Sequence, residues 1–166
     1  MARQPGYNGT SQISEAELNE ILAMIPADEK TWMLEIGAYC GVSAAWLCDR
    51  RPGLRVLSLD IFMFDTMADY KKNKRPGMSL FWGDTAQMLD HVPRKNYHVI
   101  FVDGGHDYEP CLQDLRNCGE MLFHGGRLIC HDYCPDYPGV IRAVDEYAAE
   151  KNKAVIRLAG SIVEIK

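Results

Sequence analysis

The sequence lacks several features that would place it in other classes of protein. Its 166 residues contain no run of eighteen or more apolar residues, so we expect no membrane-spanning helix. Basic residues are not in excess, since 18 Lys and Arg stand against 23 Asp and Glu. The resulting formal net charge of −5 argues against a nucleic-acid partner, because phosphate binding needs a basic surface. Internal repeats and linker-like tracts are also missing, which favours a single domain.

Paired cysteines are missing as well, because none of the six cysteines forms a Cys-x-x-Cys motif. Most of them fall within apolar patterns, where free cysteine behaves as a small buried hydrophobe. We therefore expect reduced thiols and a cytoplasmic protein. The stretch Met1–Thr10 lacks the apolar core of a signal peptide. We expect residues 1–13 to be a disordered or frayed tail and residues 14–166 to form one domain.

Hydrophobic periodicity predicts that strands and helices alternate along the chain. Ser14–Glu17 has the pattern of a capping box that begins a helix, and Pro26 follows that helix. Strands are predicted over residues 31–36, 54–59, 79–82, 97–102 and 127–130, and a final pair over 154–158 and 161–165. Helices are predicted over residues 42–49, 85–91 and 139–150, with another beginning near Pro110 and a short one within 62–77. This alternation predicts an α/β fold with a mostly parallel sheet, helices on both faces and an antiparallel strand at one edge.

The run from Glu35 to Ser43, Glu-Ile-Gly-Ala-Tyr-Cys-Gly-Val-Ser, joins a predicted strand to a predicted helix. Its glycines let the backbone approach a ligand closely at the carboxyl edge of a sheet. They are four residues apart, so the run is not the G-x-G-x-x-G fingerprint of nicotinamide-dependent enzymes. It resembles instead the first motif of class I S-adenosylmethionine (SAM) methyltransferases. That resemblance implies cofactor contacts for Glu35, Gly37, Tyr39, Gly41 and Ser43.

Acidic residues follow the next two predicted strands. Asp60 ends the second strand, where a carboxylate can receive two ribose hydroxyls; its alternative role is a helix cap or turn residue. Asp84 and Thr85 follow the third strand and could contact adenine, cap the next helix, or do both. Ile61 could pack on the adenine face.

A second group of motifs narrows the resemblance. The sequence Asp-Gly-Gly-His-Asp-Tyr occupies residues 103–108 after the fourth strand, Gly125-Gly126 precedes the fifth, and His131-Asp132-Tyr133 follows it. Here the chain resembles a branch of the class I methyltransferases that contains small-molecule O-methyltransferases, including sugar-modifying enzymes. The resemblance runs from about Leu34 to Val144 with the motifs in order. It implies a Rossmann-like, seven-stranded methyltransferase fold, SAM as cofactor and a small-molecule acceptor.

The strand ends around the predicted cofactor site carry candidate catalytic groups. His106 is the candidate general base, because imidazole titrates near neutral pH and the resembling sugar methyltransferases use the histidine of this motif; its alternative role is to fix the loop. Asp103 and Asp132 end adjacent strands, and their carboxylates could hold Mg²⁺. Both are candidate catalytic residues, and Asp103 is also a candidate cofactor contact. His131 stands where the resembling metal-dependent enzymes have an acidic residue. It is a candidate proton carrier or hydrogen-bond anchor.

Two other functions remain open at this point. One is a SAM-binding or nucleoside-binding module without transferase activity, which would keep the glycine turn and Asp60 but lack the candidate catalytic residues. Asp103, His106 and Asp132 are all present, which favours the enzyme. The other is a nicotinamide-dependent dehydrogenase, which the glycine spacing disfavours. The predicted domain has little beyond the core fold, so we also expect that a homo-oligomer could complete the acceptor pocket.

Overall fold

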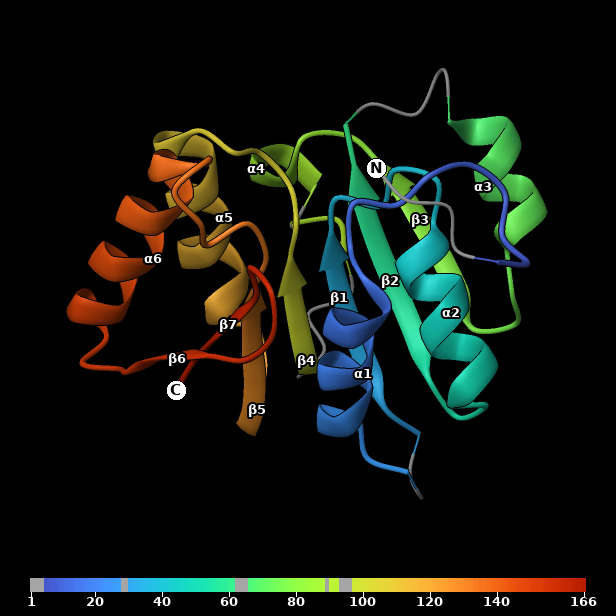
Figure 1. Cartoon of the computed structure of the whole chain (residues 1–166), viewed down its shortest axis with the longest axis horizontal. Helices are drawn as coiled ribbons and strands as arrows, with labels where there is room; N and C mark the ends of the chain where they lie inside the picture. Colours follow the sequence, from blue (N-terminus) through green and yellow to red (C-terminus); the bar gives the residue numbers. More distant parts are fainter. Residues whose placement is uncertain (1–4, 28–29, 62–65, 89, 93–96) are drawn as a thin grey trace.

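The computed structural model describes residues 5–27, 30–61, 66–88, 90–92 and 97–166. Within these ranges seven strands form one sheet in the order β3-β2-β1-β4-β5-β7-β6 (Figure 1). Neighbouring strands from β3 to β5 pair in parallel, whereas β7 pairs antiparallel with both β5 and β6. The predicted mostly parallel sheet with antiparallel pairing at one edge is therefore confirmed. β7 itself lies next to the edge, and β6 is the outermost strand.

Most elements lie within two residues of their predicted bounds, but the helix predicted over residues 85–91 ends at Met88. The strands are β1 (Trp32–Ile36), β2 (Arg55–Asp60), β3 (Met78–Trp82), β4 (Tyr97–Val102), β5 (Leu122–Cys130), β6 (Val155–Arg157) and β7 (Val163–Ile165). The helices are α1 (Glu15–Met24), α2 (Val42–Arg50), α3 (Met67–Asn73), α4 (Thr85–Met88), α5 (Tyr108–Gly119) and α6 (Pro138–Glu150).

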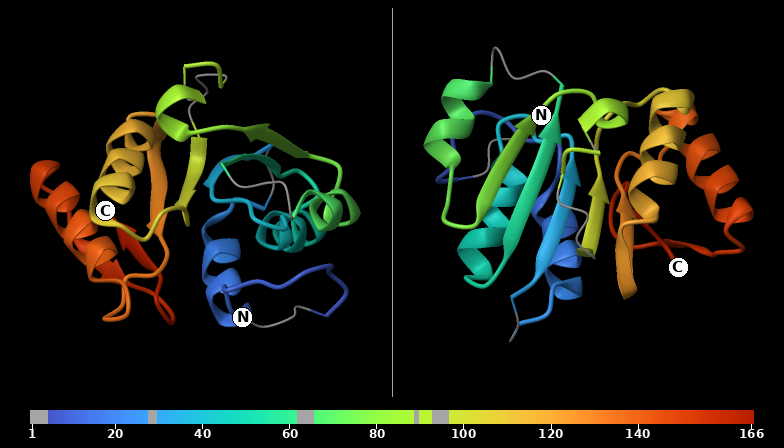
Figure 2. Two further views of the ribbon diagram at one scale, coloured as in Figure 1. Left: turned by 90° about the horizontal axis from the view of Figure 1, so that it is seen from above. Right: turned by 180° about the vertical axis from the view of Figure 1, so that it is seen from behind.

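Helices cover both faces of the twisted sheet (Figure 2). Side chains alternate across each strand, so β1 sends Leu34 and Ile36 toward the cluster built with α5 and α6. Met33 points to the opposite cluster, which α1 and α2 complete. Burial on both faces explains why the central strands read as continuous apolar runs. None of the helices in the described part of the chain has the length and apolar character needed to cross a membrane.

The first helix begins with the predicted capping box. The Glu17 amide donates to Ser14 Oγ at 3.3 Å, and Glu17 Oε2 accepts from the Ser14 amide at 2.8 Å. These contacts satisfy two amides at the start of the helix that have no partner within it.

The fifth strand differs from its prediction. It begins at Leu122 rather than Arg127, so Gly125-Gly126 lies inside β5 and not in a turn before it. Pairing with β4 shifts register between Tyr97 and Val99, and Gly125 has a φ of +83°. Glycine pairs usually interrupt a strand, but here the ladder to β4 continues across an irregularity that glycine accommodates.

The segment before α1 also differs from the expected frayed tail. Ile13 is buried and packs in the cluster formed with α1 and α2. The Asn8 amide donates to Asn73 Oδ1 at 2.8 Å, and the Tyr7 hydroxyl donates to Asp49 Oδ2 at 2.9 Å. The Ile13 side chain, the partly buried Tyr7 ring and these polar contacts attach residues 7–13 to the domain. Residues 1–4 of the predicted tail, and residues 62–65 of the predicted helix-and-loop segment, lie outside the described ranges.

Candidate cofactor and catalytic site

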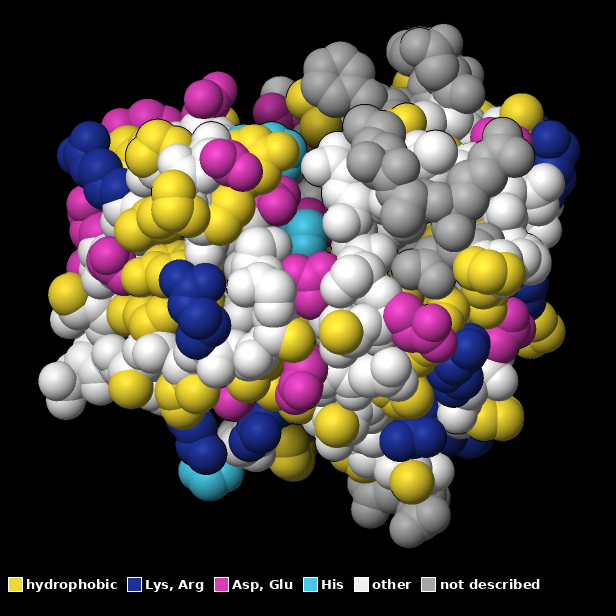
Figure 3. Space-filling model, viewed as in Figure 1, with side chains coloured by type: hydrophobic (Ala, Val, Ile, Leu, Met, Phe, Trp, Pro, Cys, Tyr) yellow, Lys and Arg dark blue, Asp and Glu magenta, His cyan; other side chains and the backbone are white. Residues whose placement is uncertain are grey.

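A cavity of about 740 Å³ lies at the carboxyl ends of β1, β2, β3 and β4. This is the edge at which open parallel sheets bind ligands. In the space-filling view, acidic and histidine side chains gather along the middle of the face shown (Figure 3). Seven of the predicted cofactor residues line the cavity: Gly37, Tyr39, Asp60, Ile61, Asp84, Thr85 and Asp103. The structure thus brings together residues from four separate strand ends.

The turn after β1 requires glycine at its first position. Gly37 has a φ of +90°, and a Cβ there would overlap the carbonyl oxygen of Asp103 at the end of β4. The ends of β1 and β4 therefore approach each other so closely that there is no room for a side chain at position 37. Tyr39 also adopts a positive φ, of +45°, and its side chain is 46% exposed at the cavity. The turn exposes backbone to the cavity and covers it with one aromatic ring.

Asp60 holds this turn in place. Its Oδ2 accepts hydrogen bonds from the amides of Ala38 at 2.8 Å and Tyr39 at 2.6 Å. The carboxylate also lines the cavity. Asp60 therefore has the turn role that the sequence left open as an alternative. It also lines the cavity, where a ligand could bind.

Three predicted cofactor residues lie outside the cavity lining. Glu35 is fully buried, where it accepts hydrogen bonds from Ser43 Oγ and, at 2.5 Å, from Ser58 Oγ. Burial outweighs these two donors and raises the pKa of Glu35 to about 7. Gly41 begins α2 with a φ of +69° and packs against Tyr70. Glu35, Gly41 and Ser43 therefore support the turn from the interior of the protein. The alternation along β1 directs the Glu35 side chain into that interior.

The loop after β3 is tied to α5. Asp84 Oδ1 accepts from the Ala86 amide at 2.8 Å, which caps α4, and Thr85 Oγ1 donates to Asp114 Oδ1. Asp114 lines the cavity and is buried, and its burial raises its pKa to about 6. Sequence reasoning missed this residue. The available signal was a carboxylate on the otherwise apolar face of a helix that includes Leu115.

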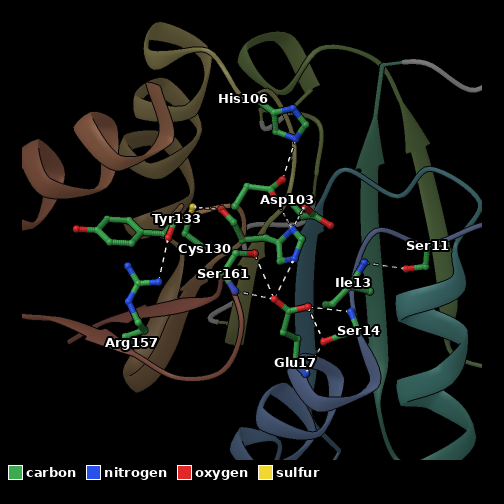
Figure 4. A network of polar contacts seen from close by, with 12 residues as sticks. Ser11, Ile13, Ser14, Glu17, Asp103, His106, Cys130, Tyr133, Arg157 and Ser161 are labelled. Carbon is green, nitrogen blue, oxygen red and sulfur yellow. Dashed lines mark hydrogen bonds and ion pairs between the residues drawn. The ribbon is translucent and has the colours of Figure 1, made fainter. Parts of the chain in front are cut away.

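His106 and Asp132 form a direct pair at the edge of the cavity. His106 Nε2 lies 2.9 Å from Asp132 Oδ2, and a dashed line marks this contact at the labelled His106 ring (Figure 4). The His106 ring packs on Tyr137 with centroids 4.2 Å apart. Asp132 has a φ of +60°, an unfavourable backbone conformation for a residue with a side chain. Such backbone strain clusters at functional sites, where the surrounding structure holds it in place.

His131 lies behind this pair and bridges the two aspartates. Its Nδ1 is 2.9 Å from Asp103 Oδ1 and 3.3 Å from Asp132 Oδ1. Its Nε2 is 3.5 Å from Glu17 Oε1, at ion-pair rather than hydrogen-bond distance. Burial disfavours the charged imidazole, but Asp103, Asp132 and Glu17 outweigh it and raise the pKa of His131 to about 12. At Asp103, burial outweighs His131 and raises the carboxyl pKa.

These residues do not fit the predicted Mg²⁺ site. The ligand atoms of Asp103, His131 and Asp132 lie within 4.8 Å of one another. Mg²⁺ takes oxygen ligands in near-ideal octahedral geometry. The two carboxylates instead converge on His131 Nδ1, a nitrogen held as a hydrogen-bond donor. The positive charge between the aspartates is therefore supplied by the chain, and no step is assigned to magnesium.

Comparisons with known proteins agree with this architecture. Residues 34–133 match the family model described as a methyltransferase domain. In structure, the chain is similar to a protein described as a caffeoyl-CoA O-methyltransferase from Staphylococcus aureus, with a TM-score of 0.75, 15% identity, and coverage of 94% of this chain and 85% of that one. It is also similar to the O-methyltransferase NovP, with a TM-score of 0.71, 18% identity, and coverage of 96% and 82%. No curated protein matches the sequence.

Proposed function

Since the chain belongs to the methyltransferase-domain family and has its class I, SAM-dependent fold, we propose that it methylates an oxygen of a small metabolite or sugar. The observation that carries this proposal is the His106–Asp132 pair at the edge of a cavity lined by the predicted cofactor residues. His106 is the proposed general base. Two of the structural neighbours are described as O-methyltransferases, which supports oxygen over nitrogen as the atom methylated.

The cavity suits SAM in charge and in shape. SAM supplies an electrophilic methyl group on a positively charged sulfur. The described lining contains no Lys or Arg and five acidic residues: Asp60, Asp84, Asp103, Glu109 and Asp114. Asp60 would receive the ribose hydroxyls, the turn at Gly37 would leave room for the methionine portion, and Ile61 would pack on adenine.

The contact with Asp132 suggests which nitrogen of His106 acts. If His106 Nε2–H donates to Asp132, the lone pair lies on Nδ1. His106 Nδ1 would then take the proton of the acceptor hydroxyl while that oxygen bonds to the methyl carbon, and the bond from that carbon to the sulfonium sulfur would break to leave S-adenosylhomocysteine. Asp132 would keep the ring oriented and stabilise the imidazolium that forms. Both residues act at the acceptor, so their loss should leave SAM binding largely intact.

The acceptor is proposed to be a small molecule that binds beside His106. The cavity continues there along Glu109 and Gln113 of α5 and Gln12 before α1. We place the protein in the cytoplasm, as its free cysteines suggest. We also propose that the protein forms a homo-oligomer. Light scattering at several protein concentrations tests this proposal.

A binding module without transferase activity is the second candidate function. It would need the turn and Asp60 but would have no use for a histidine–carboxylate pair. The presence of the His106–Asp132 pair favours the enzyme.

The test compares His106→Ala with His91→Ala, which changes an exposed histidine outside the cavity lining. Formation of S-adenosylhomocysteine is followed with a panel of sugars and small phenols. We expect His106→Ala to bind SAM as the parent does and to slow transfer by about a hundredfold or more. His91→Ala should match the parent. Equal activity of His106→Ala and the parent on a true acceptor would overturn the base assignment.

A further inference from the structure

Glu17 is a buried carboxylate that the proposed mechanism does not use. It lies on α1, outside the cavity lining and outside residues 34–133 that the family model matches. Its Oε2 accepts from the Ser14 amide at 2.8 Å and from Ser14 Oγ at 2.7 Å. Its Oε1 accepts from the Ser161 amide at 2.8 Å and faces His131 Nε2. The capping box accounts for Oε2 only.

The other oxygen begins a continuous chain of contacts that reaches the cavity (Figure 4). Glu17 Oε1 faces one nitrogen of the His131 ring, and the opposite nitrogen faces Asp103 and Asp132. The second oxygen of Asp132 then meets His106. The side chains that form this series of contacts are largely buried, apart from His106, so little water competes for their contacts.

We propose that Glu17 is a positioning residue that fixes the His131 ring and, through His131 and Asp132, the orientation of His106. Three elements distant in sequence meet at this carboxylate: the start of α1, the turn before β7 that contains Ser161, and the end of β5. A Cβ at Gly160 would overlap the Glu17 side chain, so the turn is shaped to admit it. The inference rests on the proposed role of His106 as base.

Negative and positive charges alternate from Glu17 through His131 to the two aspartates, which suits a role in positioning the His131 ring. Burial disfavours the Glu17 carboxylate, but its contacts with His131, Ser14 and Ser161 outweigh burial and hold its pKa well below the usual range. An ionised Glu17 faces one side of the His131 ring, and two aspartates face the other. The ring is therefore held from both sides, and Asp132 keeps one oxygen for His106.

The test uses Glu17→Gln, which keeps the size of the side chain but removes its charge. Ile21→Val is the matched control, because it weakens α1 one turn further along without touching the chain of contacts. The readout is the set of imidazole signals of the five histidines in NMR spectra of the protein without ligand, assigned by His106→Gln and His131→Gln. SAM binding is measured separately by calorimetry, so failure of the proposed cofactor and failure of this inference are distinguishable.

We expect Glu17→Gln to shift the ring signals of His131 and His106 and to leave those of His91, His98 and His124 in place. Ile21→Val should lower the melting temperature without moving the His106 signal. In the His131→Gln background, Glu17→Gln should no longer shift His106, because the connecting ring is gone. An unmoved His106 signal in folded Glu17→Gln would overturn the inference and leave Glu17 as a helix cap only.

A second measurement uses the unmodified protein and does not depend on a variant that folds. The His131 Nδ1–H contacts two carboxylates in a buried site, so its proton should exchange slowly with water and give a signal that His131→Gln removes. A His131 ring with no slowly exchanging N–H would contradict the proposed contacts. With an acceptor in hand, Glu17→Gln should lower kcat roughly tenfold while KM for SAM stays unchanged.

Discussion

Single residues at the carboxyl edge of the sheet combine a structural contact with a place in the cavity. Asp60 holds two amides of the turn after β1 and also faces the ligand space. Thr85 ties its loop to Asp114 and also lines the cavity. For Asp60 the sequence left ligand binding and a turn role as alternatives, and for Asp84 and Thr85 it allowed capping and ligand contact together. The structure shows that one side chain can make the structural contact and still line the cavity.

Asp60→Asn tests the ligand contact of this carboxylate at the residue scale. The amide keeps the size and one acceptor oxygen but loses the negative charge that strengthens bonds to ribose hydroxyls. Because a hydrogen bond to a charged group contributes about 1.5–3 kcal/mol, we expect SAM affinity to fall about ten- to a hundredfold in calorimetric titration. Asp49→Asn, which changes a partly exposed aspartate paired with Arg75, should bind SAM like the parent. Equal affinity of both variants would remove Asp60 from the cofactor site.

At the scale of elements, the turn between β1 and α2 determines how closely β1 and β4 approach each other. Local sequence predicted this turn, because a strand, two glycines and a helix start follow one another within nine residues. Local sequence did not predict the course of β5, where pairing with β4 overrides the usual effect of a Gly-Gly pair. Predicted element boundaries are reliable where local propensity alone determines them. They are less reliable where pairing with a neighbouring strand determines them.

Two glycine substitutions separate backbone strain from close packing. Gly37 and Gly125 both have positive φ, but a Cβ at Gly37 would overlap the Asp103 carbonyl and one at Gly125 would meet open space. We expect Gly125→Ala to cost about 1–2 kcal/mol of unfolding free energy from strain alone. Gly37→Ala should cost clearly more in urea denaturation, and it should weaken SAM binding as well. Similar losses for both variants would show that the close approach of the two strand ends is not rigid.

At the scale of the whole molecule, the site depends on contacts between parts of the chain that no local pattern connects. The order of motifs in the sequence indicated that the ends of β1, β2 and β4 would meet, since parallel strands share an edge. The contact between Glu17 and His131 could not be predicted in this way, because it depends on how α1 packs beside β5. The magnesium site stays a prediction that the structure does not support. His131, which already departed from the acidic pair of the resembling metal-dependent enzymes, lies between the two aspartates.

Buried Glu35 should give the stability of the whole protein a measurable pH dependence. Its pKa rises from an ordinary 4.5 to about 7 on folding, so its neutral form favours the folded state. That contribution is complete below about pH 4.5 and is lost as the pH rises through about 7. Glu35→Gln stays neutral throughout. We therefore expect the stability of the parent relative to Glu35→Gln to decrease between pH 5 and 8, as measured by thermal denaturation. Parallel curves would mean that Glu35 ionises in the folded protein as readily as in the unfolded chain.

The most direct measurement is a calorimetric titration of the purified protein with SAM, S-adenosylhomocysteine and NAD, each with and without Mg²⁺. A class I methyltransferase with the cavity described above should bind both sulfur nucleosides with micromolar affinity, should not bind NAD, and should show no dependence on Mg²⁺. Absence of binding to either sulfur nucleoside would contradict the proposed cofactor site, and the enzyme assignment would have to be withdrawn.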